Sequence, residues 1–218
     1  MMKLLPGVFA LCFGVAQAAD MTVLRYVDQD PGDPAYATRI LVTPHFLRMD
    51  EGDDDGDFVL LDRRQKKLFN VMRDSRLAMV FSPGSVPPRP ADWHARMVAS
   101  PAAKGLRRYR LLIDDVACSE GTVVPKTASD ATRAMAELNV VLAATQYRVW
   151  KDSPRVLQHD CDLANQVWNL DAVLKLGLPN EVREFTGKTR RLESRSKAPL
   201  KPELFRVPEG LPLIDAPS

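Results

Sequence analysis

The sequence predicts an α+β fold in which helices lie over one antiparallel sheet, and three observations lead to this prediction. Short apolar runs separated by charged turns follow one another between Tyr36 and Phe81, which is the pattern of a β-meander. Connectors this short favour antiparallel pairing, because parallel strands need crossovers of a dozen residues or more. Farther along, residues 130–145 carry apolar side chains at helical spacing, and the 218 residues suffice for one well-buried core.

The first nineteen residues have the three parts of a secretory signal peptide. Lys3 supplies the positive charge, residues 4–15 form the apolar segment, and Ala16-Gln17-Ala18 offers the small-x-small cleavage pattern. The apolar segment is shorter than the roughly 18–20 residues that span a bilayer. We therefore expect a signal peptide over residues 1–19. The mature chain, residues 20–218, is expected to be one periplasmic or otherwise exported domain without a transmembrane segment.

The mature chain begins with a predicted strand over residues 21–28, which ends at a cluster of turn-forming Asp, Pro and Gly residues. Pro44 interrupts the apolar run of residues 39–50 and marks an edge or a bulge, because proline has no backbone donor. The remaining strands of the meander are expected at residues 58–61, 68–72 and 77–81.

Prolines at five positions predict a long loop over residues 82–101 without regular structure. A strand is expected over residues 106–116, and the amphipathic helix over residues 130–145 must pack on the sheet. The later elements are a less regular helical stretch, two strands and a proline-rich tail, at residues 161–176, 181–185, 189–192 and 198–218.

Two cysteines, Cys118 and Cys161, remain after the signal peptide is removed. An even number of cysteines in an oxidising compartment predicts a disulfide between them. In the chain-entropy model, closing a loop of about 44 residues stabilises the fold by roughly 4 kcal/mol. The alternatives are a metal site or a nucleophilic thiol, in a chain that has no CxxC and three histidines.

The sequence contains no motif that identifies a catalytic site. His45, His94 and His159 are scattered, and HExxH, GxSxG, P-loop and GxGxxG patterns are absent. His159-Asp160-Cys161 looks like a triad fragment, but residues adjacent in the chain rarely converge on one point. With 30 basic and 28 acidic residues, the chain also lacks the excess of positive charge that nucleic-acid binding needs. We therefore expect a protein that is not an enzyme, has no cofactor and binds no nucleic acid.

The acidic turn at residues 50–57 has two interpretations. With Gly56 at the sixth place of a calcium loop, the ligands would be Glu51, Asp53, Asp55 and Asp62. A calcium loop of this kind is flanked by helices, whereas both flanks here have the pattern of strands. We favour a solvated hairpin turn without a metal.

A run of basic residues near the C-terminus also has two interpretations. A solvated strand edge is favoured, because edges are often charged to prevent pairing. Binding of acidic lipid head groups or of a partner is the alternative. The residues are Lys188, Arg190, Arg191, Arg195 and Lys197.

The order of these parts resembles a known family. The segments Phe46-Leu47-Arg48-Met49-Asp50, Phe58-Val59-Leu60-Leu61-Asp62 and Lys67-Leu68-Phe69-Asn70-Val71 resemble exported half-barrel proteins typified by the bacterial outer-membrane lipoprotein carriers. Residues 204–210 look like the strand with which many of these chains finish. The resemblance implies a strongly curved antiparallel sheet, a half-open barrel, with two helices over its concave face and an apolar cavity between. The paired cysteines depart from the carriers, and no ligand-contacting residue of the carriers matches a position here.

The resemblance further implies a protein that binds an apolar ligand, such as an acyl chain, a lipid or a lipidated protein, between sheet and helices. The alternative is an envelope protein-interaction or sensing module whose core is filled by its own side chains, with a partner that the sequence does not identify. The side chains expected to form the cavity wall, or that core, are Ile40, Val42, Phe46, Phe58, Leu60, Leu68, Val71, Met135, Leu138 and Leu142.

Overall fold

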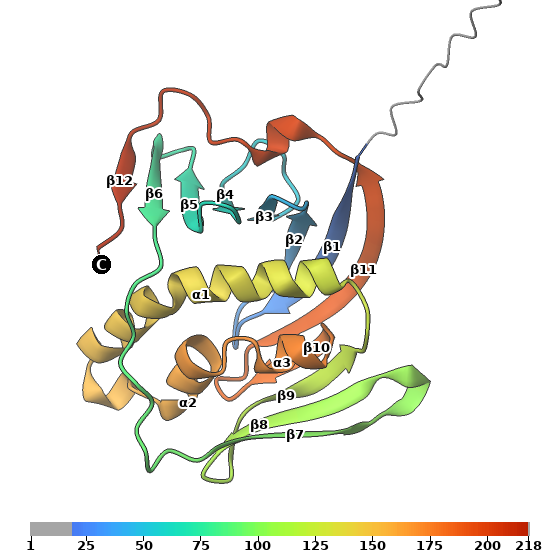
Figure 1. Cartoon of the computed structure of the whole chain (residues 1–218), viewed down its shortest axis with the longest axis vertical. Coiled ribbons are helices and arrows are strands. Elements are labelled where there is room, and N and C mark those ends of the chain that lie inside the picture. Colours follow the sequence, from blue (N-terminus) through green and yellow to red (C-terminus); the bar gives the residue numbers. More distant parts are fainter. Residues whose placement is uncertain (1–18, 218) are drawn as a thin grey trace, which may run out of the picture.

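The computed structural model describes residues 19–217, which contain one open sheet of twelve strands and three α-helices. The strand order is β12-β6-β5-β4-β3-β2-β1-β11-β10-β9-β8-β7. Neighbouring strands are antiparallel except for β12 and β6, which are parallel, so the sheet is mixed. The predicted α+β class is confirmed. The sheet curves around the long helix α1 (Ser129–Asp152), with its two halves on opposite sides of the helix (Figure 1).

Two meanders build this sheet, and they meet where β1 pairs with β11. The first meander contains β1 (Asp20–Gln29), β2 (Tyr36–Val42), β3 (Phe46–Asp50), β4 (Phe58–Asp62), β5 (Lys67–Met72) and β6 (Leu77–Phe81). The second contains β7 (Ala95–Pro101), β8 (Arg107–Ile113), β9 (Val116–Val124), β10 (Leu178–Glu184) and β11 (Thr189–Pro199). The short strand β12 (Leu213–Asp215) lies beside β6.

The predicted strands of the first meander are confirmed, with one correction at Pro44. This proline lies in the turn between β2 and β3, not at an edge or a bulge. The Thr43 hydroxyl accepts hydrogen bonds from the backbone nitrogens of His45 and Phe46, at 3.3 and 2.9 Å. Because Pro44 is at a hairpin tip, its missing donor costs the sheet no ladder hydrogen bond.

Three strands lie where the sequence does not predict them, and one of these, β12, falls within the predicted proline-rich tail. The edge strand β7 falls within the predicted loop, and most of its side chains are exposed, so it lacks the alternation of a half-buried strand. Strand β9 follows β8 through Asp114 and Asp115, whose φ angles of 44° and 70° are both in the left-handed region. Two such residues in succession form the mirror-image turn that suits a tight hairpin.

The helical layer is longer and more broken than predicted. Helix α1 continues to Asp152 instead of ending at Thr145. The second helical stretch is confirmed as irregular: it consists of α2 (Asp160–Leu163), the π-helical turn η3 (Ala164–Trp168) and α3 (Ala172–Leu176). Short 3-10 turns η1 (Ala103–Gly105), η2 (Arg155–Leu157) and η4 (Pro202–Phe205) connect other elements. None of the described helices is long and apolar enough to cross a bilayer.

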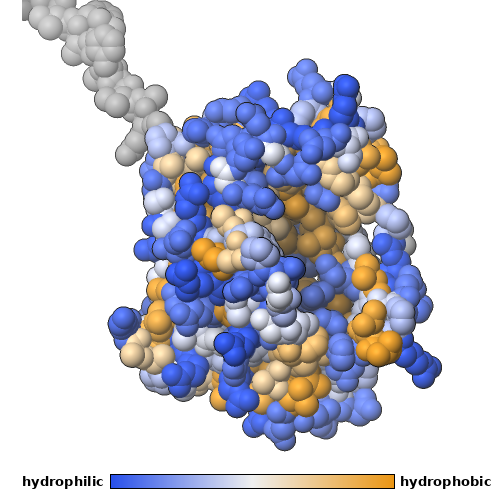
Figure 2. Space-filling view, turned by 180° about the vertical axis from the view of Figure 1, so that it is seen from behind, coloured by the Kyte–Doolittle hydropathy of each residue, from blue (hydrophilic) through white to orange (hydrophobic). Residues whose placement is uncertain are grey.

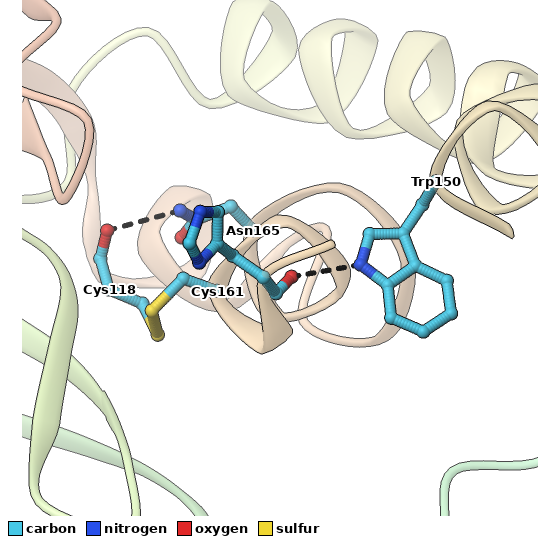
Figure 3. The surroundings of a disulfide bond; sticks show 5 residues. Cys118, Trp150, Cys161 and Asn165 are labelled. Atoms are coloured by element: carbon cyan, nitrogen blue, oxygen red, sulfur yellow. Dashed lines mark hydrogen bonds between the residues drawn. A yellow bond between two sulfur atoms is a disulfide. The ribbon is translucent and has the colours of Figure 1, made fainter. Parts of the chain in front are cut away.

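The predicted disulfide is confirmed, and it joins β9 to α2. The Cα atoms of Cys118 and Cys161 are 4.8 Å apart. Next to the disulfide, Asn165 donates from Nδ2 to the Cys118 carbonyl oxygen at 3.1 Å, and Trp150 donates from Nε1 to the His159 carbonyl oxygen at 3.0 Å (Figure 3). These contacts fasten the helical layer to the second meander. A disulfide is typical of proteins from oxidising compartments. The predicted signal peptide lies outside the described residues except for Ala19.

Both faces of the first meander are buried. The concave face packs against α1, where Ala131 and Ala134 meet a cluster that includes Leu24, Tyr26 and Leu61. The opposite face packs against η4, whose Leu204 and Phe205 cover a second cluster. A third cluster surrounds the disulfide beneath the second meander. The C-terminal segment therefore acts as a second cover on the sheet, in addition to the helices.

Candidate functional site

A groove of about 480 Å³ lies between the end of β4, helix α1 and the turn η3. Its volume falls within the range of roughly 300–1,000 Å³ that is usual for small-molecule sites. The apolar residues that line it are Leu61, Val140, Val141, Val167, Trp168 and Leu170. The view from behind shows apolar side chains gathered around a hollow, framed by hydrophilic ones (Figure 2).

Helix α1 contributes two neighbouring valines to the groove. Val141 is 2% exposed and belongs to the core beneath the helix, whereas Val140 is 50% exposed. The valine side chain is entirely apolar, and its exposure to water is unfavourable. A ligand that covers an exposed valine within an apolar groove would therefore gain binding energy. Val140 can therefore be substituted to alter the groove without disturbing the core.

The π-helical turn η3 contributes Trp168, and this ring is held in place from two directions. Its Nε1 donates to the Pro87 carbonyl oxygen at 3.1 Å. Its ring meets the ring of Trp93 edge to face, with the centroids 4.7 Å apart. The proline-rich loop thus fixes the aromatic wall of the groove.

The rim of the groove is organised by Arg63, whose side chain is 7% exposed. Its guanidinium donates to Glu137 at 2.6 Å, to Asp130 at 3.1 Å and to the Thr43 carbonyl oxygen at 2.8 Å. These bonds fasten the β4–β5 turn to α1. Lys66, Arg133 and Asp171 also line the groove. Arg133 is paired with Asp130 at 3.3 Å and Asp171 with Lys175 at 2.7 Å, so Lys66 is the lining cation that has no ion pair among the described residues.

The residues predicted to form one cavity wall lie on two faces of the sheet. Ile40, Val42 and Leu68 belong to the concave cluster, together with the helix residues Met135, Leu138 and Leu142. The other four, Phe46, Phe58, Leu60 and Val71, lie in the cluster on the opposite face under η4. Placing these four on the concave wall was wrong. Successive side chains of a strand point to opposite faces, and β4 is apolar on both, so its pattern does not say which face meets α1.

The space directly beneath the first half of α1 is filled by side chains. Ala131 and Ala134 are 1% and 0% exposed, and they pack against buried residues of β1 and β4. The groove at Val140 therefore lies beside this packed region, between the sheet and the helical layer.

Two of the four candidate calcium ligands accept hydrogen bonds within their own turns, and the other two, Glu51 and Asp55, are exposed. Asp53 accepts a hydrogen bond from the Asp55 backbone nitrogen at 2.9 Å, and Asp62 accepts from the backbone nitrogens of Arg64 and Gln65, each at 2.9 Å. Among residues 19–217, no group of three or more His, Cys, Asp or Glu side chains is arranged to hold a metal ion.

The acidic turn instead encloses a buried arginine that the sequence reasoning missed. Arg48 is 1% exposed and donates to Asp50 at 2.6 Å and to the Asp54 carbonyl oxygen at 3.0 Å. Arg39 also donates to Asp50, through two hydrogen bonds of 2.8 and 2.9 Å. The sequence does contain one indication of this burial, because Arg48 is a charged residue within an otherwise apolar strand.

The basic residues of β11 divide into two groups. Arg190 does not lie at a strand edge, because β11 pairs with both β1 and β10 there, and it holds Asp28 through two hydrogen bonds of 2.7 Å. Lys188, which lies just before β11, pairs with Asp30 at 3.2 Å. Beyond Arg191, β11 pairs with β1 alone, so Arg195 and Lys197 do lie along an open edge.

The three histidines are exposed and come from different parts of the fold. His45 lies in the β2–β3 turn, His94 precedes β7, and His159 precedes α2. The His159 ring packs edge to face on Phe185, and Cys161 is oxidised in the disulfide, so residues 159–161 do not form a triad. The expectation that the protein is not an enzyme stays a prediction.

Comparison with known proteins identifies no family. No family model matches the sequence, and no curated protein matches it. Among solved structures, two crystal forms of PNGF-II align with 91% of this chain, at 9% and 11% identity and TM-scores of 0.35 and 0.37. The chain spans 31% and 32% of the length of those two chains. A likeness this weak carries no argument, and the relationship to the lipoprotein carriers stays a prediction.

Proposed function

We propose that this protein is an exported, half-open barrel that binds the acyl chain of an amphiphile in the groove between β4, α1 and η3. The observation that carries the proposal is the exposed Val140 within an apolar groove of about 480 Å³. The curved sheet, the disulfide and the resemblance to half-barrel carriers support the same architecture and compartment.

The composition of the groove favours an anionic amphiphile. Each methylene group that moves from water to an apolar wall contributes about 0.8 kcal/mol, so a chain of several carbons would bind appreciably. Lys66 at the rim would attract a carboxylate or phosphate head group. Arg133 is already paired with Asp130 at 3.3 Å. Because Arg63 is already paired with Glu137 and Asp130, it shapes the rim and is not expected to bind the head group.

The proposal is tested with two matched valines on one helix. Val140→Glu places a charge in the groove, and Val149→Glu places the same charge at a 54% exposed position outside it. In displacement of a fluorescent fatty acid, we expect Val140→Glu to weaken binding at least tenfold and Val149→Glu to bind as the natural protein does. Native mass spectrometry of gently purified protein should also show co-purifying lipid. Equal affinities for the two variants would contradict the proposal.

A second candidate function is that of a protein-interaction module with a filled core. It is favoured by the packed region beneath α1 and by β7, an edge strand whose second side has no partner strand in the described chain. An exposed edge of this kind accepts an added strand from a partner. Cross-linking from β7 positions to a specific protein, without any lipid binding, would favour this function over the first.

A further inference from the structure

A second pocket, of about 250 Å³, lies between strands β8–β11, helix α1 and the η3–α3 segment. Leu170 lines both this pocket and the acyl-chain groove, so the two are neighbours that share a wall. Asn139 of α1 donates to the Leu170 carbonyl oxygen at 3.0 Å and holds that wall in place. The second pocket differs from the groove because many of its lining groups are polar.

Two of these polar groups are buried without a partner. The Tyr109 side chain is 1% exposed, and its hydroxyl makes no hydrogen bond within the described residues. The Asn169 Nδ2 atom is likewise buried and unpaired among residues 19–217. Ser119 is close enough to lower the pKa of the Tyr109 hydroxyl, but the two hydroxyl groups do not have the geometry of a hydrogen bond. Buried polar atoms are nearly always paired, so two donors left unpaired beside one pocket indicate a missing partner.

A carboxyl group completes the polar side of the pocket. Glu184 lines the same pocket as Tyr109. Burial, and then the charge of Glu184, raise the pKa of Tyr109. Burial also raises the pKa of Glu184 itself. The two cations that line the pocket are already paired, Lys188 with Asp30 and Arg190 with Asp28. The pocket therefore offers two unpaired buried donors and the Glu184 carboxylate, and its described lining residues include no free cation for an anionic ligand.

We propose that this pocket binds a small neutral molecule that carries a secondary amide. The amide carbonyl would accept from the Tyr109 hydroxyl and from Asn169 Nδ2, and the amide N–H would donate to Glu184. The side chains of Leu111, Leu170 and Val182 would contact the carbon skeleton. The volume of about 250 Å³ equals that of about eight water molecules at roughly 30 Å³ each, which suits one sugar ring or one capped amino acid.

Secondary amides come from two sources, acetamido sugars and peptides, so two probes are used. The mature protein is titrated with N-acetylglucosamine and with N-acetyl-alanine methylamide, and binding is followed by NMR chemical shifts and by the melting temperature. Saturable binding of either probe, with shifts confined to the pocket, supports the proposal and identifies the source. Absence of saturable binding by both probes overturns it, because the unpaired donors would then be satisfied by water.

Variants distinguish a binding role from a structural one. Tyr109→Phe removes an unpaired hydroxyl, so we expect the melting temperature without ligand to stay level or rise, while affinity for the probe falls at least tenfold. Asn169→Asp, which replaces a donor by an acceptor, should lose affinity to a similar extent. Tyr147→Phe, at a tyrosine outside this pocket, should bind as the natural protein does. Unchanged affinity in both Tyr109→Phe and Asn169→Asp would overturn the proposal.

Val140→Glu should leave amide binding intact. A failure of the acyl-chain proposal can therefore be distinguished from a failure of the amide proposal.

Discussion

Arg48 donates from Nη1 to the carbonyl oxygen of Leu204 at 3.0 Å, and this bond joins the acidic turn to the C-terminal cover of the sheet. The Arg48 guanidinium also lies over the Phe58 ring, 4.0 Å from its centroid. The arginine thus contacts two members of the apolar cluster beneath η4, Phe58 and Leu204.

Replacing Arg48 by methionine should destabilise the protein by about 3 kcal/mol. The substitution keeps an unbranched stem but removes the guanidinium, and it leaves the buried carboxylate of Asp50 with Arg39 as its remaining ionic partner. Urea unfolding at pH 7 measures the change. The control is Arg96→Met, which removes an exposed pair with Asp115 and should cost less than about 1 kcal/mol. Similar losses of unfolding free energy in the two variants would show that burial does not strengthen the contribution of the Arg48 network to stability.

Removal of the disulfide should lower the free energy of unfolding by roughly 4 kcal/mol, because Cys118 and Cys161 are separated by 43 residues. The double variant Cys118→Ala, Cys161→Ala is compared with the natural protein in guanidinium unfolding. Because the bond fastens α2 to β9, the loss should appear first as faster amide exchange in α2 and η3. Equal stability of the two proteins would contradict this account of how the helical layer is attached.

Asp28 should make the protein sensitive to acid. Burial alone would raise the pKa of Asp28, but the hydrogen bonds and charge of Arg190, together with the Thr38 hydrogen bond and the charge of Lys188, hold the pKa below the ordinary value of 3.8. A lowered folded-state pKa gives stability that is fully present above pH 3.8 and is lost as the pH falls through the folded-state value. In urea unfolding between pH 6 and pH 2, Asp28→Asn should be less stable at pH 6 and should lose less stability on acidification. A parallel decline in both proteins would rule out this role.

Gly121 should not tolerate alanine. A Cβ atom at this position of β9 would lie 1.8 Å from the carbonyl oxygen of Glu181, so β10 would have to move. We expect a loss of at least about 2 kcal/mol, or failure to fold. Gly56→Ala is the control, because its Cβ would make contacts of 3.4 Å or more. Thermal unfolding compares the two variants, and a stable Gly121→Ala protein would show that β9 and β10 are less closely apposed than described.

Much of the fold follows from local sequence patterns. The strands of the first meander alternate with charged turns, and α1 has a clear apolar stripe, so these elements are predictable. The edge strand β7 was missed because its exposed side chains carry no alternation, and β9 because Asp114 and Asp115 do not have the glycine that usually marks such a turn.

The candidate sites depend on contacts between distant segments, which local patterns do not reveal. The concave and opposite faces of β4 are both apolar, and only the position of Leu204 and Phe205 shows which residues lie under η4. The groove around Val140 needs β4, α1 and η3 together. The unpaired hydroxyl of Tyr109 is a property of its surroundings in the folded chain, since an apolar strand pattern alone would place it in an ordinary core.

The central claim, that the groove holds an acyl chain, is tested most directly by measuring the dissociation constants of saturated fatty acids of increasing length. We predict that affinity rises by up to about fourfold for each added methylene, corresponding to about 0.8 kcal/mol, until the groove is full, and then levels off. In Val140→Glu this dependence should be lost. Affinities that do not change with chain length in the natural protein would contradict the claim.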